Sequence, residues 1–150
     1  MPTVTATAQV INNSDQYSSN IQVHQHELLV DEPLEKGGED LGPAPGDYLC
    51  AALASCTAIT LRMYAARKKW KIAEIKVTVN LVMGKNMDSG KNTFFCELSF
   101  KGDLDEDQLK RLQVIANSCP LHKLLTKPNE IITSLQTGNS LQVFNYDQYK

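Results

Sequence analysis

The sequence predicts an α+β protein in which helices pack against antiparallel sheets. Residues 47–70 contain neither Pro nor Gly and are rich in Ala and Leu, which predicts one long helix. Two strictly alternating apolar runs, residues 75–83 and 94–100, flank the turn segment 87–90 and predict an antiparallel hairpin. A chain of 150 residues is long enough for one core but marginal for two, so we expect a single domain over residues 1–150.

Two strands and an irregular loop are expected before the long helix. Residues 3–10 are short and β-branched and precede a turn cluster at 12–15, and residues 21–30 alternate loosely as a second strand would. Between residues 31 and 46 the chain carries three prolines and four glycines. So many breakers predict an irregular loop that leads into the helix.

One face of the long helix is expected to pack on the core, because a set of its residues recurs at steps of three and four. The set consists of Leu49, Leu53, Cys56, Thr60 and Met63. Basic side chains gather at the C-terminal end of the helix, where cations complement its dipole. A phosphate or nucleic-acid site is the alternative interpretation of this cluster, which contains Arg62, Arg67, Lys68, Lys69 and Lys71.

A second helix, a short helical turn and a second hairpin are expected after the first hairpin. Residues 103–107 are acidic and precede Leu109, Leu112 and Ile115, a pattern typical of a helix N-terminus. Pro120 opens the short helical turn at 121–126. Residues 131–135 and 141–144 flank a Gly-Asn pair at 138–139, which predicts the second hairpin.

Composition and charge exclude several classes of protein. Fifteen basic and seventeen acidic residues leave a net charge of −2, which gives no electrostatic reason to expect a nucleic acid or a membrane as partner. No stretch approaches the roughly 20 uninterrupted apolar residues of a membrane-spanning helix. The N-terminus has neither the basic region nor the apolar region of a signal peptide, so we expect a cytoplasmic protein.

The four cysteines do not form the dense pattern of a disulfide framework, so they are expected to be thiols at rest. Cys96 shares its strand face with three large apolar residues and is expected to be buried packing. Cys50 precedes Cys56 by six residues, about 120° away around the helix axis, and is also expected to pack.

Cys119 is followed by Pro120, which makes it the expected N-cap of the short helical turn. A thiol in this position faces free backbone N–H groups that lower its pKa, and His122 would lie close on the same face. A half-buried cysteine at a helix junction is an equally open interpretation. Cys56 lies in mid-helix on the apolar face, where local sequence alone indicates core packing, and nothing in the spacing shows that it meets Cys119.

Three segments together resemble proteins of the OsmC/Ohr family, OsmC-like branch. The run GPAPGDYLCAALASCTAITLRMYAARKKW, residues 42–70, resembles the first cysteine helix of that family, and NSCPLHKLL, residues 117–125, resembles its second cysteine motif. HELLVDEP and GGEDLGP, within residues 26–43, are similar to the loop that approaches the first motif. The order and lengths of the other elements extend the resemblance over nearly the whole chain.

The resemblance implies an intertwined homodimer in which antiparallel sheets wrap around a long central cysteine-bearing helix and a second helix. It implies two sites at the subunit interface, where Cys56 and Cys119 face each other. The first cysteine would attack an organic hydroperoxide and become a sulfenic acid, and the second would close a disulfide. A small dithiol or a thioredoxin-like protein would then reduce the disulfide, so no cofactor is expected.

One departure from the family pattern concerns activation of the first cysteine. The peroxidase branch uses an arginine from the N-terminal region paired with a carboxylate, whereas this chain has no arginine before Arg62. Asp47 is the nearest candidate for the carboxylate. His26, with His24 on the same strand face, could replace the cation, although ordinary strand histidines are the alternative. Without a cation, burial should raise the pKa of Cys56.

Two other functions stay open at this point. One is a non-catalytic redox-sensing or ligand-binding protein that keeps the cysteine pair. The other is a metal site built from Cys56, Cys119 and His122, which is less favoured because the chain has no paired CxxC or HxxxH cluster. We therefore expect no metal.

Overall fold

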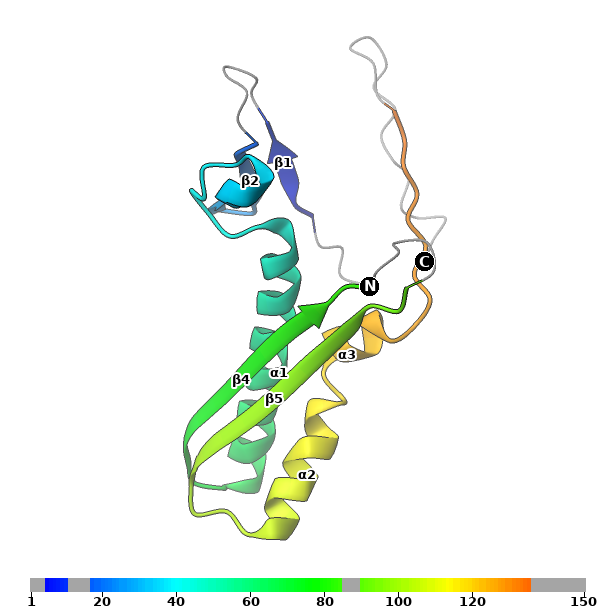
Figure 1. Cartoon of the computed structure of the whole chain (residues 1–150). Coiled ribbons are helices and arrows are strands. Elements are labelled where there is room, and N and C mark those ends of the chain that lie inside the picture. Colours follow the sequence, from blue (N-terminus) through cyan, green and yellow to red (C-terminus); the bar gives the residue numbers. More distant parts are fainter. Residues whose placement is uncertain (1–4, 11–16, 85–89, 136–150) are drawn as a thin grey trace.

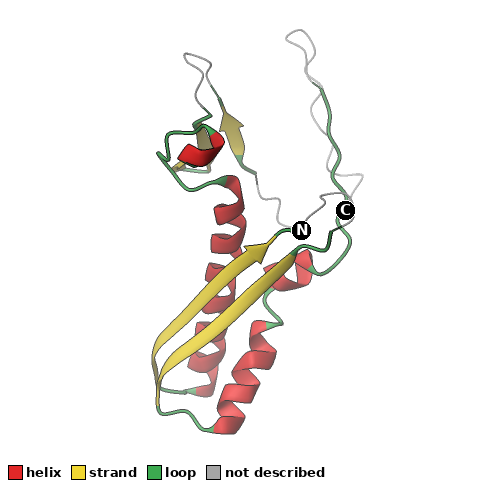
Figure 2. Cartoon of the chain, viewed as in Figure 1, coloured by secondary structure: helices red, strands yellow, loops and turns green. Residues whose placement is uncertain are grey.

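The fold was obtained as a computed structural model, which describes residues 5–10, 17–84 and 90–135. The α+β class is confirmed, with antiparallel sheets and one long helix (Figures 1 and 2). In chain order the elements are β1 (Thr7–Gln9), β2 (Ser19–Val23), β3 (His26–Val30), the 3-10 turn η1 (Leu34–Lys36), α1 (Pro45–Lys68), β4 (Ile72–Val82), β5 (Thr93–Gly102), α2 (Glu106–Ala116) and α3 (Pro120–Leu125).

The N-terminal strands form a small antiparallel sheet in the order β1-β2-β3 near the start of α1 (Figure 1). The expected single strand at 21–30 is wrong, because the chain turns at His24, whose φ is 53°, and Val23 pairs with His26. Nothing predicted this turn, since its residues lack the Gly or Asn that usually mark a two-residue hairpin turn. The Tyr48 hydroxyl donates to the Leu29 carbonyl at 2.8 Å and ties this sheet to α1.

The loop between β3 and α1 is organised around one buried carboxylate. Asp31 is 2% exposed and accepts backbone N–H bonds from Glu32 at 2.8 Å, Glu39 at 3.1 Å and Leu41 at 3.2 Å. Burial alone would raise the pKa of Asp31, but the three N–H donors outweigh it and lower the pKa. Gly38 is required in this loop, because a Cβ there would lie 1.8 Å from the Glu32 carbonyl oxygen.

The core-facing side of α1 differs from the expected one. The helix buries Leu53, Thr57, Leu61, Tyr64 and Ala65. Leu49 and Met63, on the expected face, are 49% and 64% exposed instead, and Cys56 is half-buried. The helix is apolar on most sides, so periodicity could not identify the side that the hairpin covers.

The length and apolar composition of α1 would also allow it to cross a membrane, with a mean hydropathy of 1.4 over 18 residues. Helices from the cores of soluble proteins meet the same criterion, so the finding assigns no location.

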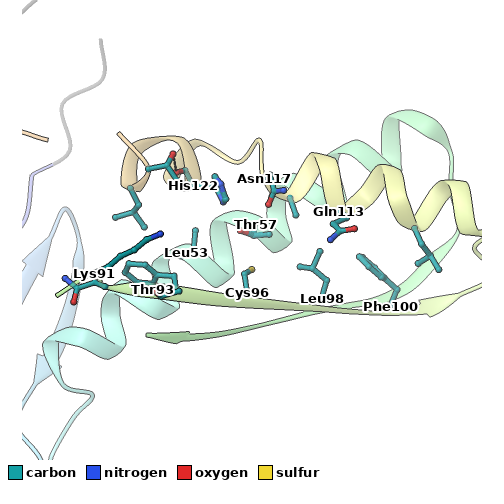
Figure 3. Close-up of a pocket in the computed structure, with 16 residues that line it drawn as sticks. Leu53, Thr57, Lys91, Thr93, Cys96, Leu98, Phe100, Gln113, Asn117 and His122 are labelled. Atoms are coloured by element: carbon teal, nitrogen blue, oxygen red, sulfur yellow. Dashed lines mark hydrogen bonds between the residues drawn. The ribbon is translucent and has the colours of Figure 1, made fainter. Parts of the chain in front are cut away.

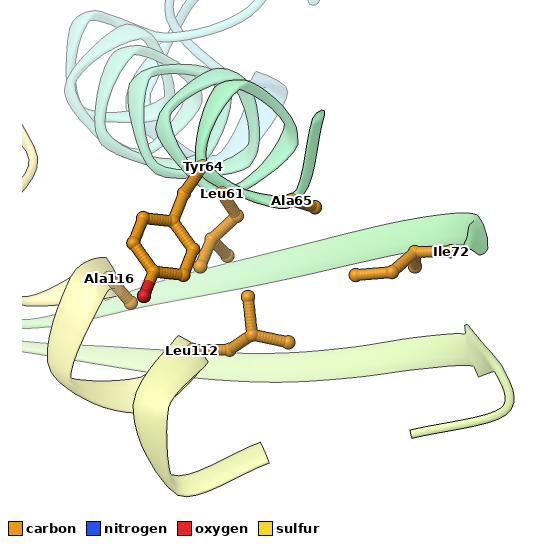
Figure 4. Packing of buried hydrophobic residues seen from close by; sticks show 6 residues of the cluster. All are labelled: Leu61, Tyr64, Ala65, Ile72, Leu112 and Ala116. Carbon is orange, nitrogen blue, oxygen red and sulfur yellow. The ribbon is translucent and has the colours of Figure 1, made fainter. Parts of the chain in front are cut away.

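The core lies where α1 and α2 meet the β4–β5 hairpin (Figure 4). The expected hairpin is confirmed, with Val79 opposite Cys96, although its turn residues 87–89 lie outside the described part of the chain. The N-terminus of α2 is also confirmed: the Asp105 side chain accepts from the Gln108 N–H at 2.7 Å. The buried cluster consists of Leu61, Tyr64, Ala65, Ile72, Leu112 and Ala116.

The expected second hairpin is not found within the described residues. Residues 131–135 lie in irregular backbone rather than in a strand, and residues 138–144 lie outside the part of the chain that the structure describes.

Truncating Leu61 should strongly destabilise the fold, because its side chain is fully buried at the centre of this cluster. We expect Leu61→Ala to lower the free energy of unfolding by about 2–5 kcal/mol. Leu34→Ala, at a position that is 70% exposed, is the control and should change it by less than about 0.5 kcal/mol. Urea unfolding at one fixed protein concentration measures both, and equal losses would contradict the assignment of the core.

Candidate functional site

The structure brings Cys56 and Cys119 together across the α1–α3 contact. Cys56 is half-buried on α1, whereas Cys119 is 0% exposed between α2 and α3. Cys119 lies close enough to Cys56 to be among the influences on the pKa of its thiol. The two cysteines lie far apart in the sequence, so the packing of α3 against α1 brings them close together.

Cys119 caps the N-terminus of α3, as the following proline predicted. Its Sγ accepts the His122 backbone N–H at 3.2 Å and the Thr57 hydroxyl at 3.4 Å. Full burial distinguishes this cap from the half-buried junction that was the alternative. His122 contributes its backbone to the thiol, while its side chain lines a neighbouring cavity.

Burial raises the pKa of the Cys56 thiol and is the largest influence on it. The adjacent side chain of Cys119 and its charge also raise the pKa. Hydrogen bonds from the Leu121 backbone and the Thr60 side chain lower it without compensating. The raised pKa agrees with the expectation for a mid-helix thiol that lacks a neighbouring cation.

All three arginines of the chain are engaged away from the thiols. Arg62 donates to the Ile72 carbonyl at 2.7 Å, and Arg111 donates to the Tyr64 hydroxyl at 3.0 Å. The Arg67 guanidinium lies 5.8 Å from the centre of the Tyr64 ring. Within one chain, no arginine is therefore placed to stabilise a Cys56 thiolate.

Two of the expected supporting residues have other roles within the chain. Asp47 accepts the Ala44 N–H at 2.9 Å and so caps the first turn of α1. His26 is exposed at the start of β3, and His24 lies in the preceding turn instead of sharing a strand face with it. Neither Asp47 nor His26 makes a described contact with Cys56 or Cys119. Across the described residues, no group of three His, Cys, Asp or Glu side chains could hold a metal ion.

A cavity of about 910 Å³ lies beside the cysteine pair, between β5 and the three helices (Figure 3). Thr57 and His122 line it, and both also bond to Cys119. Neither Cys56 nor Cys119 is itself part of the lining, so the cavity adjoins the pair without containing it. Its apolar wall comes from Leu53, Phe94, Leu98, Phe100, Leu109 and Leu125.

The expectation that Cys96 is buried packing is wrong. Its side chain is exposed and lines the cavity, because β5 and α2 leave this space open between them. Partial burial raises the pKa of Cys96, and the charge of nearby Cys119 raises it further. Cys50 is half-buried and has no described contact with the other thiols.

The fold and the site define a class of small α+β proteins in which a long helix and a helix N-cap each supply one thiol of a pair. A match to the family of OsmC-like proteins covers residues 37–134. This chain belongs to the OsmC-like family. No curated protein matches it.

Solved structures of this family share the fold at low sequence identity. An OsmC-like protein from Mycoplasma pneumoniae has a TM-score of 0.69 and 20% identity, covering 83% of this chain and 87% of its own. An organic hydroperoxide resistance protein OsmC from Legionella pneumophila has a TM-score of 0.66 and 19% identity, and the match covers 84% of this chain and 90% of that protein's chain. An organic hydroperoxide resistance protein from Elizabethkingia anophelis has a TM-score of 0.64 and 21% identity, and the match covers 84% of this chain and 89% of that protein's chain.

Proposed function

We propose that this chain is a cytoplasmic thiol-dependent peroxidase that reduces organic hydroperoxides through Cys56 and Cys119 in defence against oxidative stress. The observation that carries the proposal is the proximity of a half-buried thiol on α1 to a fully buried thiol at the start of α3. Membership of the OsmC-like family supports it, as do the names of the Legionella and Elizabethkingia proteins as organic hydroperoxide resistance proteins.

Cys56 is the attacking residue in this proposal. Its thiolate attacks the terminal oxygen of the hydroperoxide, the O–O bond breaks, and the alcohol leaves after protonation. Cys56 is left as a sulfenic acid. The Cys119 sulfur then attacks the Cys56 sulfur, water leaves, and a disulfide closes between them. A small dithiol or a thioredoxin-like protein supplies two electrons and two protons to restore both thiols.

Exposure supports this division of roles. Cys119 is 0% exposed, so a peroxide cannot reach its sulfur from solvent, whereas Cys56 is only half-buried. A resolving thiol this close can trap the sulfenic acid before a second peroxide oxidises it further.

The working form in this proposal is a homodimer with its sites at the subunit interface. Ile59 and Met63 lie on the same side of α1 as Cys56 and are 60% and 64% exposed. Large apolar side chains along one helix face are costly to leave in water, and a second copy of the chain would cover them. The apolar surface beside Cys56 would favour an organic hydroperoxide over hydrogen peroxide.

A non-catalytic redox-sensing or ligand-binding protein is the second candidate. It is favoured by the raised pKa of Cys56 and by the engagement of all three arginines elsewhere. Both features lower the thiolate fraction near neutral pH and so slow attack on a peroxide.

Single-turnover oxidation, measured across a range of pH with the thiols counted afterwards, separates the two candidates, because only the peroxidase loses thiols. Because the pKa of Cys56 is raised, the thiolate fraction should increase about tenfold per pH unit and continue to increase beyond pH 8.5, roughly the free thiol value. Stopped-flow mixing of reduced protein with cumene hydroperoxide, and separately with hydrogen peroxide, should therefore show a rate that climbs through this range. A count of thiols after each reaction checks the stoichiometry.

Two other results would contradict these expectations. A rate already constant by about pH 6 would mean that an activator lowers the pKa of Cys56, contrary to the contacts within one chain. An unchanged thiol count at every pH would favour the non-catalytic candidate.

A further inference from the structure

Cys96 shares a cavity with a residue that bonds to the cysteine pair. It lies on β5 opposite Val79, and its sulfur points from the strand toward Thr57 of α1 (Figure 3). Both side chains line the same cavity, and the Thr57 hydroxyl bonds directly to the Cys119 sulfur at 3.4 Å. A single hydroxyl-bearing residue thus links the wall that carries Cys96 to the buried thiol of the pair.

Cys119 is the thiol that acts on both of the others. It influences the pKa of Cys56, and its charge also raises the pKa of Cys96. Among the influences on the pKa of Cys56, Cys119 is present and Cys96 is not. Cys119, and not Cys56, is therefore the member of the pair that lies near Cys96.

The thiols of Cys56 and Cys96 face different spaces. Cys56 shares its side of α1 with the exposed residues Ile59 and Met63, whereas Cys96 opens into the cavity between β5 and the helices. A volume of about 910 Å³ is in the range of small-molecule sites, roughly 300–1,000 Å³. A small dithiol can therefore fit on the Cys96 side, while the fully buried Cys119 is closed to it.

We propose that Cys96 is a third redox thiol, which takes over the disulfide from Cys56 and presents it to a small dithiol reductant in the cavity. The proposal rests on the peroxidase function proposed above for Cys56 and Cys119. It assigns a role in turnover to a residue outside the family's cysteine pair.

The relay consists of two thiol–disulfide exchanges. The Cys96 thiolate attacks the Cys119 sulfur of the Cys56–Cys119 disulfide, the S–S bond breaks, and Cys56 leaves as a thiolate that takes up the proton from Cys96. The dithiol then attacks the Cys96 sulfur of the new Cys96–Cys119 disulfide, releases Cys119, and closes its own disulfide by releasing Cys96. The dithiol is oxidised and all three protein thiols are restored.

The first test is whether Cys96 and Cys119 can form a disulfide when no peroxide is present. Cys56→Ser protein is treated with the thiol oxidant diamide and mapped by mass spectrometry after alkylation of free thiols. We expect an intrachain Cys96–Cys119 disulfide, with Cys50 left free. The matched control is the Cys56→Ser/Cys96→Ser protein, which should form no intrachain disulfide. Circular dichroism spectra that match those of the wild type establish that both variants are folded.

The second test follows reduction in the wild-type background. Protein oxidised with one equivalent of cumene hydroperoxide is mixed with dithiothreitol, and recovery of thiols is timed. We expect Cys96→Ser to recover about tenfold more slowly than wild type, because access governs exchange rates, and Cys50→Ser to recover at the wild-type rate.

The relay is overturned if the Cys56→Ser protein forms no Cys96–Cys119 disulfide, or if Cys96→Ser recovers as fast as Cys50→Ser. These outcomes differ from failure of the proposed function. If the wild-type protein consumed no peroxide while diamide still joined Cys96 to Cys119 in Cys56→Ser, the peroxidase proposal would fail and the thiol proximity would stand.

Discussion

Replacing Cys56 with serine should abolish peroxide consumption. A serine hydroxyl has almost the same size but stays protonated at working pH, so the attacking thiolate disappears while the packing of α1 is kept. We expect the loss to be on the order of a thousandfold or more, the scale on which removal of a covalent nucleophile acts. The rate of cumene hydroperoxide consumption in the presence of excess dithiothreitol, corrected for the reaction without protein, measures it.

Cys50→Ser is the matched control for this experiment. Cys50 is on the same helix and is also half-buried, but it makes no described contact with the other thiols. Its replacement should leave the rate within about twofold of wild type. Wild-type turnover in Cys56→Ser would show that another thiol attacks the peroxide, and the division of roles between Cys56 and Cys119 would be wrong.

Cys119→Ser should separate the first oxidation from turnover. Serine is a good N-cap, so its hydroxyl can accept the His122 N–H that Cys119 accepts now, and α3 should be retained. The Cys56 sulfenic acid then has no adjacent thiol and should proceed to sulfinic acid under excess peroxide. The first equivalent of peroxide should still oxidise Cys56 to the sulfenic acid and a second should carry it to the sulfinic acid, while turnover with dithiothreitol should fall by on the order of a hundredfold or more.

The same variant should also change the acidity of Cys56. The adjacent side chain of Cys119 and its charge both raise the pKa of Cys56, so their loss should lower that pKa and let the first oxidation proceed at lower pH. Mass spectrometry of the intact protein after stepwise addition of peroxide at several pH values counts the oxygen adducts, and peptide mapping locates them. Adducts on a residue other than Cys56 would contradict the assigned order of attack.

Much of the fold could be predicted because its signals are local. The strict alternation of β4 and β5, the breaker-free run of α1 and the acidic start of α2 each depend on neighbours in sequence. The turn at His24 was missed because its residues are not the usual ones for a two-residue turn, so tertiary pairing of β2 with β3 decides it. The buried side of α1 was missed because an apolar helix has no single hydrophobic face to identify.

The site was predictable only in part, for a related reason. Pro120 marked Cys119 as a helix cap, since that signal is local. The proximity of Cys119 to Cys56 depends on how α3 packs against α1, and only the resemblance to the OsmC/Ohr family implied it. Cys96 was misjudged because alternation shows which strand face a residue occupies, but not whether the helices above that face close over it.

The order in which disulfides appear tests the central claim most directly. Fully reduced wild-type protein is mixed with less than one equivalent of cumene hydroperoxide, quenched with acid at increasing times, alkylated and mapped by mass spectrometry. The proposed function predicts that the first disulfide to form joins Cys56 to Cys119. A first disulfide that includes Cys50, or peroxide consumption that leaves both Cys56 and Cys119 as alkylated thiols, would contradict it.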